Sequence, residues 1–355
     1  MNETITLSTR QKEIINIIAH SSGVTREDIA LKLNNVFSAS KATLARDLKS
    51  LVDAGLIQAI GSGPSTAYKA VSKHPLLTFI DLEQYFSVDP DERNFANKNF
   101  DDKIFKLLPR LIDETEQKEL GKEFRSFNEV IKNLDHTIVE RELERYVIEL
   151  AWKSSKIEGN TYTLLETESL IKQGKEAEGK THQESMMILN HKEAFKLILE
   201  HRKDFIKLIN RDLFELHNVL TKDMDISSGI RKQAVGITGT AYTPLVHEWE
   251  LKIALEKMIK LVNETKFPLE KALLISVLLA YIQPFADGNK RSARMLANAI
   301  LLAHDYFPLS YRSVNENEYK QAMIIFYETG NIYHFKRLFL DQYRFALKTY
   351  FQVAK

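Results

Sequence analysis

The first 75 residues contain three short segments in which apolar residues recur three and four positions apart. These segments lie near 14–18, 29–33 and 44–52, and their spacing predicts three helices that each bury one face. Residue types that favour helix N-caps precede them: Ser8 or Thr9, Thr25 and Ser38. Because each helix is short, we expect the three to pack against one another.

The third helix is predicted to end at Ala54-Gly55, and two short apolar runs follow at 56–60 and 67–71. The glycine-containing segment 61–66 between them indicates a strand pair around a flexible tip. This order resembles a winged helix-turn-helix. The resemblance places four residues of the third helix at a DNA major groove: Ser40, Lys41, Thr43 and Arg46. A docking or dimerisation module is the alternative, since Asp47 and Asp53 offset the basic residues.

From residue 136 onward the apolar pattern is helical almost throughout. The predicted helices are 139–156, 164–173, 184–199, 205–220, 251–262, 268–282 and 289–302. Residues 76–135, with a polar stretch at 94–102, indicate a connecting region of loops and short helices. The predicted organisation is therefore a small α+β domain at 1–75, a connecting region at 76–135 and a helical domain at 136–355.

Segment 229–244 interrupts the helical pattern with several glycines. Val235 and Ile237 alternate with smaller or polar residues, which predicts a short β-hairpin standing off the helical core. A lone hairpin is marginally stable, so we expect it to lean on the helices.

Composition narrows the class of protein. Lys plus Arg (49) nearly equals Asp plus Glu (48), so binding to nucleic acid would have to be local. The absence of cysteine excludes disulfides and cysteine nucleophiles. Residues 1–9 lack a secretory signal pattern, and the longest apolar run, 272–282, is too short to span a bilayer. We therefore expect a soluble cytoplasmic protein without a membrane partner.

The stretch QPFADGNKRSAR at 283–294 concentrates groups that bind phosphate. A predicted helix ends before Pro284, and another begins near Asn289 with its backbone N–H groups free to bind an anion. Gly288 allows phosphate oxygens to approach the backbone, while Arg291 and Arg294 add fork-shaped donors. Asp287, beside these phosphates, is a natural ligand for Mg²⁺.

This stretch is similar to the Fic motif of the Fido superfamily, His-x-Phe-x-Asp/Glu-Gly-Asn-Gly/Lys-Arg-x-x-Arg, and the likeness extends over most of residues 135–340. The resemblance implies a helical bundle whose hairpin, the flap, holds a target segment by β-augmentation. The corresponding flap residues are Val235, Gly236, Ile237, Thr238 and Gly239. The stretch SSKIEGN at 154–160 resembles the family's inhibitory motif, with Ser154, Glu158 and Gly159 at its specified positions.

Most family members transfer AMP from ATP to a Ser, Thr or Tyr hydroxyl of a protein. The resemblance implies that Asp287 holds Mg²⁺, that Gly288 and Asn289 line the α-phosphate site, and that Arg291 and Arg294 hold outer phosphates. Lys290 belongs to the same nucleotide-binding stretch, and Tyr319 is the candidate to flank the adenine. It also implies that Glu158 pairs with Arg294 and obstructs the γ-phosphate.

The sequence departs from the family at the first motif position, where Gln283 replaces histidine. That histidine is the general base, and a carboxamide does not titrate near neutral pH. Three explanations stay open: a member that binds nucleotide or partner without catalysis, a member that uses a different base, and a substitution made to trap a complex. His191 and His247 lie outside the motif.

Two functions follow as hypotheses. The first is an ATP-binding Fic-type protein, autoinhibited by Glu158 and catalytically impaired by Gln283, whose AMP acceptor is a target protein or its own chain, within one molecule or in a homodimer. The alternative is a non-catalytic, nucleotide-responsive DNA-binding transcriptional regulator. Relatives that transfer UMP or phosphocholine leave the donor open.

Overall fold

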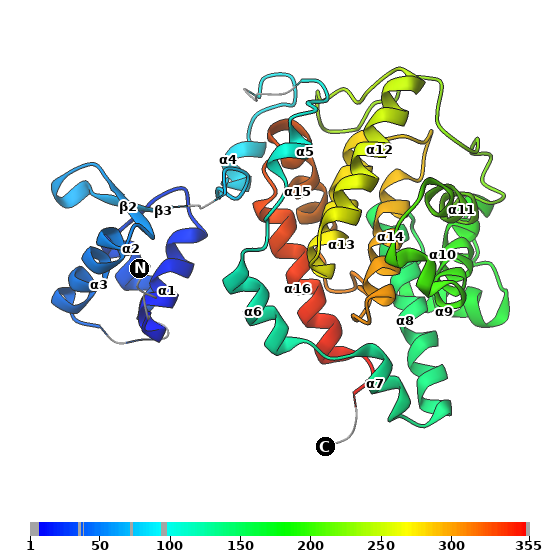
Figure 1. The fold of residues 1–355 in the computed structure, drawn as a ribbon, viewed down its shortest axis with the longest axis horizontal. Coiled ribbons are helices and arrows are strands. Elements are labelled where there is room, and N and C mark those ends of the chain that lie inside the picture. Colours follow the sequence, from blue (N-terminus) through cyan, green and yellow to red (C-terminus); the bar gives the residue numbers. More distant parts are fainter. Residues whose placement is uncertain (1–6, 35–36, 38, 72–73, 94–97, 353–355) are drawn as a thin grey trace. The chain divides into compact units, whose positions relative to one another are not determined.

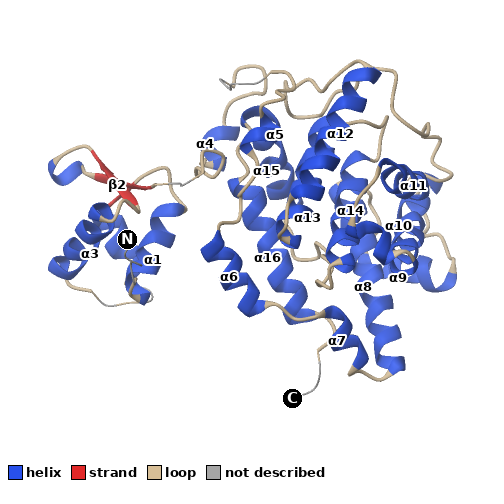
Figure 2. Cartoon of the chain, viewed as in Figure 1, coloured by secondary structure: helices blue, strands red, loops and turns tan. Residues whose placement is uncertain are grey.

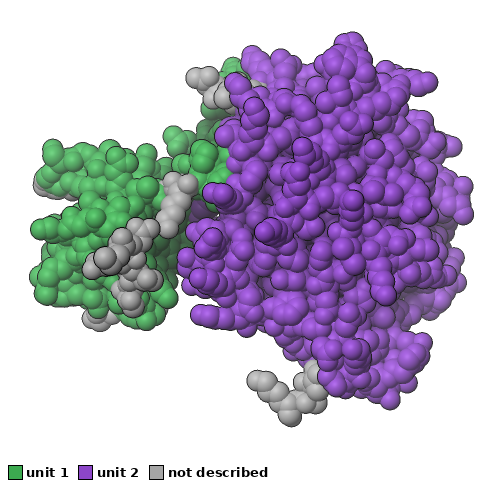
Figure 3. Space-filling view, viewed as in Figure 1, with its two compact units in different colours: residues 1–93 green, residues 94–355 purple. Residues whose placement is uncertain are grey.

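A computed structural model describes residues 7–34, 37, 39–71, 74–93 and 98–352. Within these residues the secondary structure is mainly α-helical, and the strands gather in one small sheet (Figures 1 and 2). The chain divides into two compact units, 1–93 and 94–355, which Figure 3 distinguishes by colour.

The first unit contains the three predicted helices and a three-stranded antiparallel sheet. Its helices are α1 (Thr9–Ala19), α2 (Arg26–Leu33), α3 (Lys41–Asp53) and the short α4 (Leu82–Phe86); its strands are β1 (Val24–Thr25), β2 (Ile57–Ile60) and β3 (Ala67–Ala70), and a 3₁₀ turn, η1, spans Gly63–Ser65. The strand order is β1-β3-β2, so the predicted strand pair gains a third member. Ile14, Ile29 and Leu48 belong to its buried core.

Hydroxyl side chains cap the three main helices of this unit. Ser8 and Thr25 accept hydrogen bonds from the backbone N–H groups of Gln11 and Asp28, as the sequence predicts. The third helix starts later than expected, because Ser40 is its N-cap and accepts from Thr43 N. The predicted cap Ser38 lies outside the described residues.

The second unit is built from helices. In chain order they are α5 (Ile104–Leu107), α6 (Glu114–Glu123), α7 (Phe127–Lys132), α8 (His136–Ile157), α9 (Leu164–Gln173), α10 (His182–Glu200), the 3₁₀ helix η2 (Arg202–Ile206), α11 (Asn210–Leu220), α12 (Glu248–Glu264), α13 (Pro268–Ile282), α14 (Asn289–Ala303), α15 (Glu316–Thr329) and α16 (Tyr333–Thr349). From Leu269 to Ile282 every residue of α13 is buried, and α14 packs along it. A helix that is apolar on all sides belongs in a protein interior, which is where α13 lies.

Residues 98–135 of the predicted connecting region belong to the second unit and pack on its later helices. The backbone N–H of Asp101 donates to the Tyr281 hydroxyl (2.9 Å), and that of Leu111 donates to Glu270 Oε1 (2.8 Å). Asn128 N likewise donates to Asp305 Oδ1 (2.7 Å). Buried backbone N–H groups need acceptors, and here side chains of α13 and of the turn after α14 supply them.

Segment 229–244 does not form the predicted β-hairpin. The structure has no strand there; its one ladder contact is an isolated parallel bridge between Thr243 and Asn99. Instead, side chains near the two ends of the segment bind the end of α13: Arg231 Nε donates to Gln283 O (2.6 Å), and the Tyr242 hydroxyl donates to Tyr281 O (3.0 Å). Two short alternating runs without a third strand gain little from pairing, so side-chain anchors determine this loop.

Among the described residues, none of the helices combines the length and the apolar character that a membrane crossing requires.

Candidate functional site: the start of helix α14

The candidate site is built around the short loop between α13 and α14. Gln283 ends α13 in the left-handed conformation (φ 52°, ψ 57°), and its backbone N–H still donates to Leu279 O. Gly288 is the N-cap of α14, also left-handed (φ 79°), and Asn289 begins the helix as the sequence predicts. Two left-handed residues reverse the chain within a few positions, so the N-terminal amides of α14 lie next to the end of α13.

Asn289 ties this loop together. Its Oδ1 accepts from Phe285 N (2.9 Å), and its Nδ2 donates to Phe285 O (2.9 Å) and to Gln283 Oε1 (2.9 Å). The amide group of Gln283 is used at both ends, because its Nε2 donates to Ala280 O (2.7 Å). Both side chains are buried, so these hydrogen bonds are shielded from water and fix the loop.

Gly288 is required for space as well as for its backbone angle. A Cβ atom at this position would lie 3.0 Å from Thr221 Cγ2 and 3.5 Å from His217 Nε2, both on the C-terminal part of α11 or its cap. The sequence predicts that glycine here lets a phosphate approach the backbone; the structure adds that α11 lies against this glycine's other side.

The two motif arginines differ in their partners. Arg291 is buried, and its Nη2 donates to Asp287 Oδ2 (3.1 Å) while the Asp287 side chain is 68% exposed. Burial lowers the pKa of Arg291, an effect that the nearby carboxylates of Asp287 and Glu158 oppose. Its Nη1 lies 3.4 Å from both Leu220 O and Met224 Sδ, which are neutral acceptors, so a further anion could still bind this guanidinium.

Arg294 is fully buried and is held from the end of α8. Its Nε donates to Ser154 Oγ (2.9 Å), its Nη2 to Ser154 O (2.9 Å) and its Nη1 to Glu158 Oε1 (2.8 Å). The other oxygen of Glu158 lies 2.8 Å from Lys290 Nζ. Glu158 therefore bridges two cations that both belong to the predicted phosphate site. Gly159, at φ 98°, follows directly and ends the helix.

Electrostatics favour the ionised form of Glu158. Burial by itself would raise its pKa, but the charges of Arg294 and Lys290 outweigh burial and hold the pKa at about 2. The carboxylate is thus charged throughout the neutral range. The pKa of Arg294 is correspondingly raised, although burial opposes this change.

Tyr319, the predicted adenine neighbour, lies in the interior. Its side chain is only 2% exposed. The Arg294 guanidinium lies 5.5 Å from the centroid of its ring, and the ring packs edge to face on Phe335 with centroids 5.4 Å apart. Its contact in this structure is with the arginine that the sequence assigns to the outer phosphates, which brings the two predicted residues together.

His217 on α11 is a neighbour of the motif that the sequence did not single out. Its ring stacks on Phe285 with centroids 3.7 Å apart, and its Nε2 lies 3.0 Å from Asp287 O. A carbonyl only accepts, so Nε2 carries the proton and donates, while the buried Nδ1 has no hydrogen-bond partner among the described residues. The ring is fully buried and supports the loop.

His191 on α10 is also brought to the site. Its Nε2 lies 2.8 Å from Ser154 Oγ, and burial lowers its pKa to about 3, so the ring is neutral. His247, by contrast, is exposed at the start of α12. Neither His191 nor His217 is near the motif in sequence, and only the packing of α10 and α11 against α14 reveals them.

The predicted target-binding residues lie in the irregular loop described above. Val235 and Ile237 are half-buried, whereas Gly236, Thr238 and Gly239 are exposed. Arg231 fixes the start of this loop, since its backbone N–H donates to Pro284 O (2.9 Å) and its guanidinium donates to the carbonyls of Gln233 and Leu245. The loop therefore has an exposed middle and a base attached to the motif.

The acidic groups at the site suit Mg²⁺ that arrives with phosphate. No cluster of three or more His, Cys, Asp or Glu that could hold a metal occurs among the described residues. Mg²⁺ commonly binds one or two protein carboxylates and completes its shell with water and phosphate oxygens. Asp287 fits this role, because its carboxylate is exposed and lies beside Arg291 at the mouth of the anion site.

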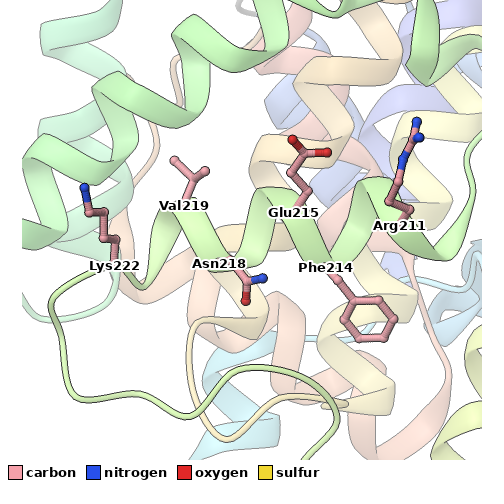
Figure 4. Close-up of a pocket in the computed structure, with 6 residues that line it drawn as sticks. All are labelled: Arg211, Phe214, Glu215, Asn218, Val219 and Lys222. Atoms are coloured by element: carbon pink, nitrogen blue, oxygen red, sulfur yellow. The ribbon is translucent and has the colours of Figure 1, made fainter.

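A groove with a volume of about 550 Å³ runs along α11, and Figure 4 shows the side chains that line it. Its lining residues all come from this helix and the turn after it: Arg211, Phe214, Glu215, Asn218, Val219 and Lys222. None of the predicted site residues lines it. The groove and the motif share one neighbour, because Phe214 lines the groove and its ring packs edge to face on Phe285, with centroids 5.8 Å apart.

In the first unit, the predicted DNA-contacting residues share one region of α3. Ser40, Lys41 and Arg46 are exposed and Thr43 is half-buried, with Thr43 N bonded to Ser40 Oγ. Asp47, which the sequence suggests would offset these basic residues, is turned inward and binds Arg10 Nε at 2.6 Å.

Comparison with known proteins agrees with this architecture. Residues 203–301 match the Fic/DOC family. Two solved structures have the same fold. Fic-1 (residues 134–508) from C. elegans gives a TM-score of 0.56 with 22% identity, and the match covers 67% of this chain and 71% of that chain. A Fic family protein from Desulfovibrio desulfuricans G20 gives a TM-score of 0.52 with 20% identity, and the match covers 72% of this chain and 76% of that chain. Residues 203–301 of the second unit are thus similar to the Fic/DOC family, and the unit has the fold of the two solved Fic proteins.

The relatives matched by sequence are proteins named protein adenylyltransferase Fic. The one from Culex quinquefasciatus is 29% identical over 216 residues, which is 59% of this chain and 42% of that protein; the one from Nematostella vectensis is 29% identical over 197 residues, or 52% and 44%. The chain thus spans less than half the length of these relatives.

Proposed function

We propose that the chain binds ATP at the start of α14 and is built for the transfer of AMP to a protein hydroxyl. The observation that carries the proposal is the position of Glu158. Its Oε1 lies 2.8 Å from Arg294 Nη1, and its Oε2 lies 2.8 Å from Lys290 Nζ. A carboxylate that bridges two cations beside a free helix N-terminus occupies the place that outer phosphates would need. The matched relatives named as adenylyltransferases support ATP as the nucleotide.

In this proposal each residue has a defined task. The N-terminal amides of α14 and Gly288 receive the α-phosphate, and Arg291 and Arg294 neutralise the outer phosphates once Glu158 withdraws. Asp287 would hold Mg²⁺, which supplies charge neutralisation at the phosphates when bound. The loop at 235–239 would hold an extended segment of the target protein, or of this chain, by backbone hydrogen bonds.

The chemical step requires a proton acceptor that Gln283 does not provide. The target hydroxyl forms a bond to the α-phosphorus, pyrophosphate leaves, and the hydroxyl proton must go to a base. The Gln283 amide does not titrate, and both of its ends are engaged by Ala280 and Asn289. His217 is buried with its Nε2–H bound to Asp287 O, so it is not a substitute. AMP transfer by the present chain is therefore weak.

The test compares four proteins: the chain as it is, Glu158→Gly, Gln283→His and the double variant. Each is incubated with ATP labelled at the α-phosphate, with a parallel reaction labelled at the γ-phosphate to separate AMP transfer from phosphate transfer. We expect ATP binding in Glu158→Gly and self-labelling from the α-label in the double variant, about 10²–10⁴-fold above Glu158→Gly. Titrations with UTP and CDP-choline examine the other donors that family members use.

Absence of ATP binding in Glu158→Gly would refute the proposal. Transfer by Glu158→Gly that equals the double variant would instead show that another base acts and that Gln283 is not limiting.

A second function, DNA binding by the first unit, is favoured by one observation. Because Asp47 is directed inward to Arg10, the exposed surface of α3 keeps Lys41, Arg46 and Lys49 without that carboxylate. We propose that this helix contacts DNA.

Fluorescence anisotropy with a labelled random-sequence duplex should show binding to the first unit that weakens as the salt concentration rises. Lys41→Glu/Arg46→Glu should lose about tenfold in affinity, whereas Lys32→Glu on α2 should lose much less; no binding even at low salt would refute the proposal.

A further inference from the structure

A chain of hydrogen bonds links α10 to the arginine that Glu158 occupies. His191 Nδ1 lies 2.6 Å from Met187 O, His191 Nε2 lies 2.8 Å from Ser154 Oγ, and Arg294 Nε donates to the same oxygen at 2.9 Å. Both His191 and Ser154 lie outside the motif at 283–294.

The direction of every proton in this chain is determined by its ends. The Met187 carbonyl can only accept, so His191 Nδ1 carries the proton and Nε2 is the acceptor. The Ser154 hydroxyl must then donate to Nε2, which turns its lone pairs toward Arg294. If Nε2 carried a proton, two donors would face Ser154 Oγ and the hydroxyl hydrogen would lose its acceptor.

Burial makes this arrangement strict. His191, Ser154 and Arg294 are each 0% exposed, so water cannot replace a lost partner. The same burial keeps the ring neutral, with its pKa lowered to about 3, and the charges of Arg291 and Arg294 act in the same direction.

Ser154 and Glu158 hold different edges of the guanidinium. Ser154 takes Nε–H through its hydroxyl and one Nη2–H through its carbonyl, whereas Glu158 takes Nη1–H. Removal of Glu158 therefore leaves the Ser154 contacts in place, with Nη1 still directed toward the position of the anion.

We propose that His191 is a positioning residue: through the Ser154 hydroxyl it fixes Arg294 in the orientation that meets an anion. In the resting chain that anion is the Glu158 carboxylate. The further claim, that the same orientation presents Arg294 to the outer phosphates of ATP, rests on the proposed function.

The test uses the full chain in the Glu158→Gly background and measures ATP and AMP binding by calorimetry. His191→Phe keeps an aromatic ring but lacks an acceptor; His191→Gln keeps an oxygen that can accept from Ser154. We expect His191→Phe to weaken ATP binding by about tenfold, equivalent to roughly 1.4 kcal/mol, and to leave AMP binding unchanged because AMP has no outer phosphates. His191→Gln should recover most of the loss.

Equal losses for ATP and AMP, or no recovery in His191→Gln, would overturn the proposal, since a purely structural defect predicts both. Thermal melts of all variants establish whether they fold.

A second measurement needs no nucleotide and separates this proposal from the proposed function. With Glu158 present, NMR of the Arg294 Nε–H should give a slowly exchanging signal that is lost in His191→Phe and kept in His191→Gln. The histidine nitrogens should report a neutral ring protonated at Nδ1. A ring protonated at Nε2, or an Arg294 signal indifferent to His191→Phe, would overturn the positioning role, whereas a failure of Glu158→Gly to bind ATP would refute the proposed function alone.

Discussion

Gln283 combines an unusual backbone conformation with a side chain whose hydrogen bonds are all local. It has φ 52°, a left-handed value that few residues other than glycine adopt, and its amide contacts Ala280 and Asn289. The side chain therefore stabilises the loop that its backbone reverses. The loop is thus held in place without a titratable group, and under the proposed function we expect nucleotide binding to persist while AMP transfer is weak.

Gly288 gives a test of close packing at a single atom. Gly288→Ala places a methyl group 3.0 Å from Thr221 Cγ2 on a backbone with φ 79°, and we expect a loss of about 2–4 kcal/mol in the free energy of unfolding. Gly159→Ala is the matched control, because it has φ 98° but nothing within 4 Å, and should cost only the backbone term of about 1–2 kcal/mol.

Urea unfolding of Gly288→Ala, Gly159→Ala and the double variant Gly288→Ala/Thr221→Ser checks this expectation. Serine lacks the Cγ2 methyl and keeps the hydroxyl that donates to His217 O, so the double variant should recover stability. If it does not, Thr221 is not the obstacle.

At this scale the sequence predicted the local backbone of the motif better than the contacts of its side chains. The motif spacing placed Gly288 before a helix that does begin at Asn289. The contribution of His191 and His217 was not predictable, because each lies on another helix and no local pattern connects it to residues 283–294. Only tertiary packing brings such residues together.

Segment 229–244 is an element whose prediction was wrong, because it forms a loop and not a β-hairpin. Alternating Val235 and Ile237 is typical of a strand, but a strand needs a partner, and no neighbouring edge exists in the described part of the second unit. The loop is determined by Arg231 and Tyr242 instead. Arginine at 231 carried no recognisable signal, since its acceptors are backbone carbonyls distant in sequence.

Arg231→Lys tests how this loop is attached to the motif. Arg231 is 2% exposed and donates to the carbonyls of Gln283, Gln233 and Leu245, which a single ammonium group cannot reach together. We expect a loss of about 1–3 kcal/mol and faster amide exchange in residues 229–245 and 283–288, with α13 still protected. Hydrogen exchange measured by mass spectrometry distinguishes these segments.

Arg211→Lys is the control for this change, because the Arg211 side chain is 70% exposed and its ion-pair partner is the adjacent Asp212. It should leave both exchange and stability nearly unchanged. Equal effects of the two substitutions would contradict the anchoring role of Arg231.

For the whole molecule, buried His191 predicts a loss of stability in mild acid. Its pKa is about 3 in the folded chain and near 6.5 when unfolded, so the unfolded state binds more protons as the pH falls from 6.5 toward 3. Between pH 7 and pH 5 this linkage lowers the free energy of unfolding by about 2 kcal/mol. Urea unfolding at pH 7, 6 and 5 should give a smaller decrease in His191→Gln; parallel curves for the two proteins would contradict the prediction.

Glu158 behaves in the opposite way over the same range. Its pKa of about 2 lies below the unfolded value near 4.5, so its stabilising contribution is complete above pH 4.5 and is lost only as the pH falls toward 2. Acidification within the physiological range therefore does not release Arg294 from Glu158.

At this scale the helical character and the Fic fold were predictable, since motif and periodicity agree over the second unit. The boundaries between the units were less predictable than the fold. The structure divides into units 1–93 and 94–355, because residues 98–134 pack on helices far along the chain. Polar stretches indicate where a chain is exposed but do not indicate which surface it covers.

The identity of residue 283, a buried glutamine whose amide is hydrogen-bonded at both ends, has an evolutionary consequence. Glutamine and histidine codons differ only in the third base. A lineage that carries this chain is thus one nucleotide change away from a titratable group at the start of the turn before α14, at the cost of the hydrogen bonds that the Gln283 amide makes to Ala280 and Asn289.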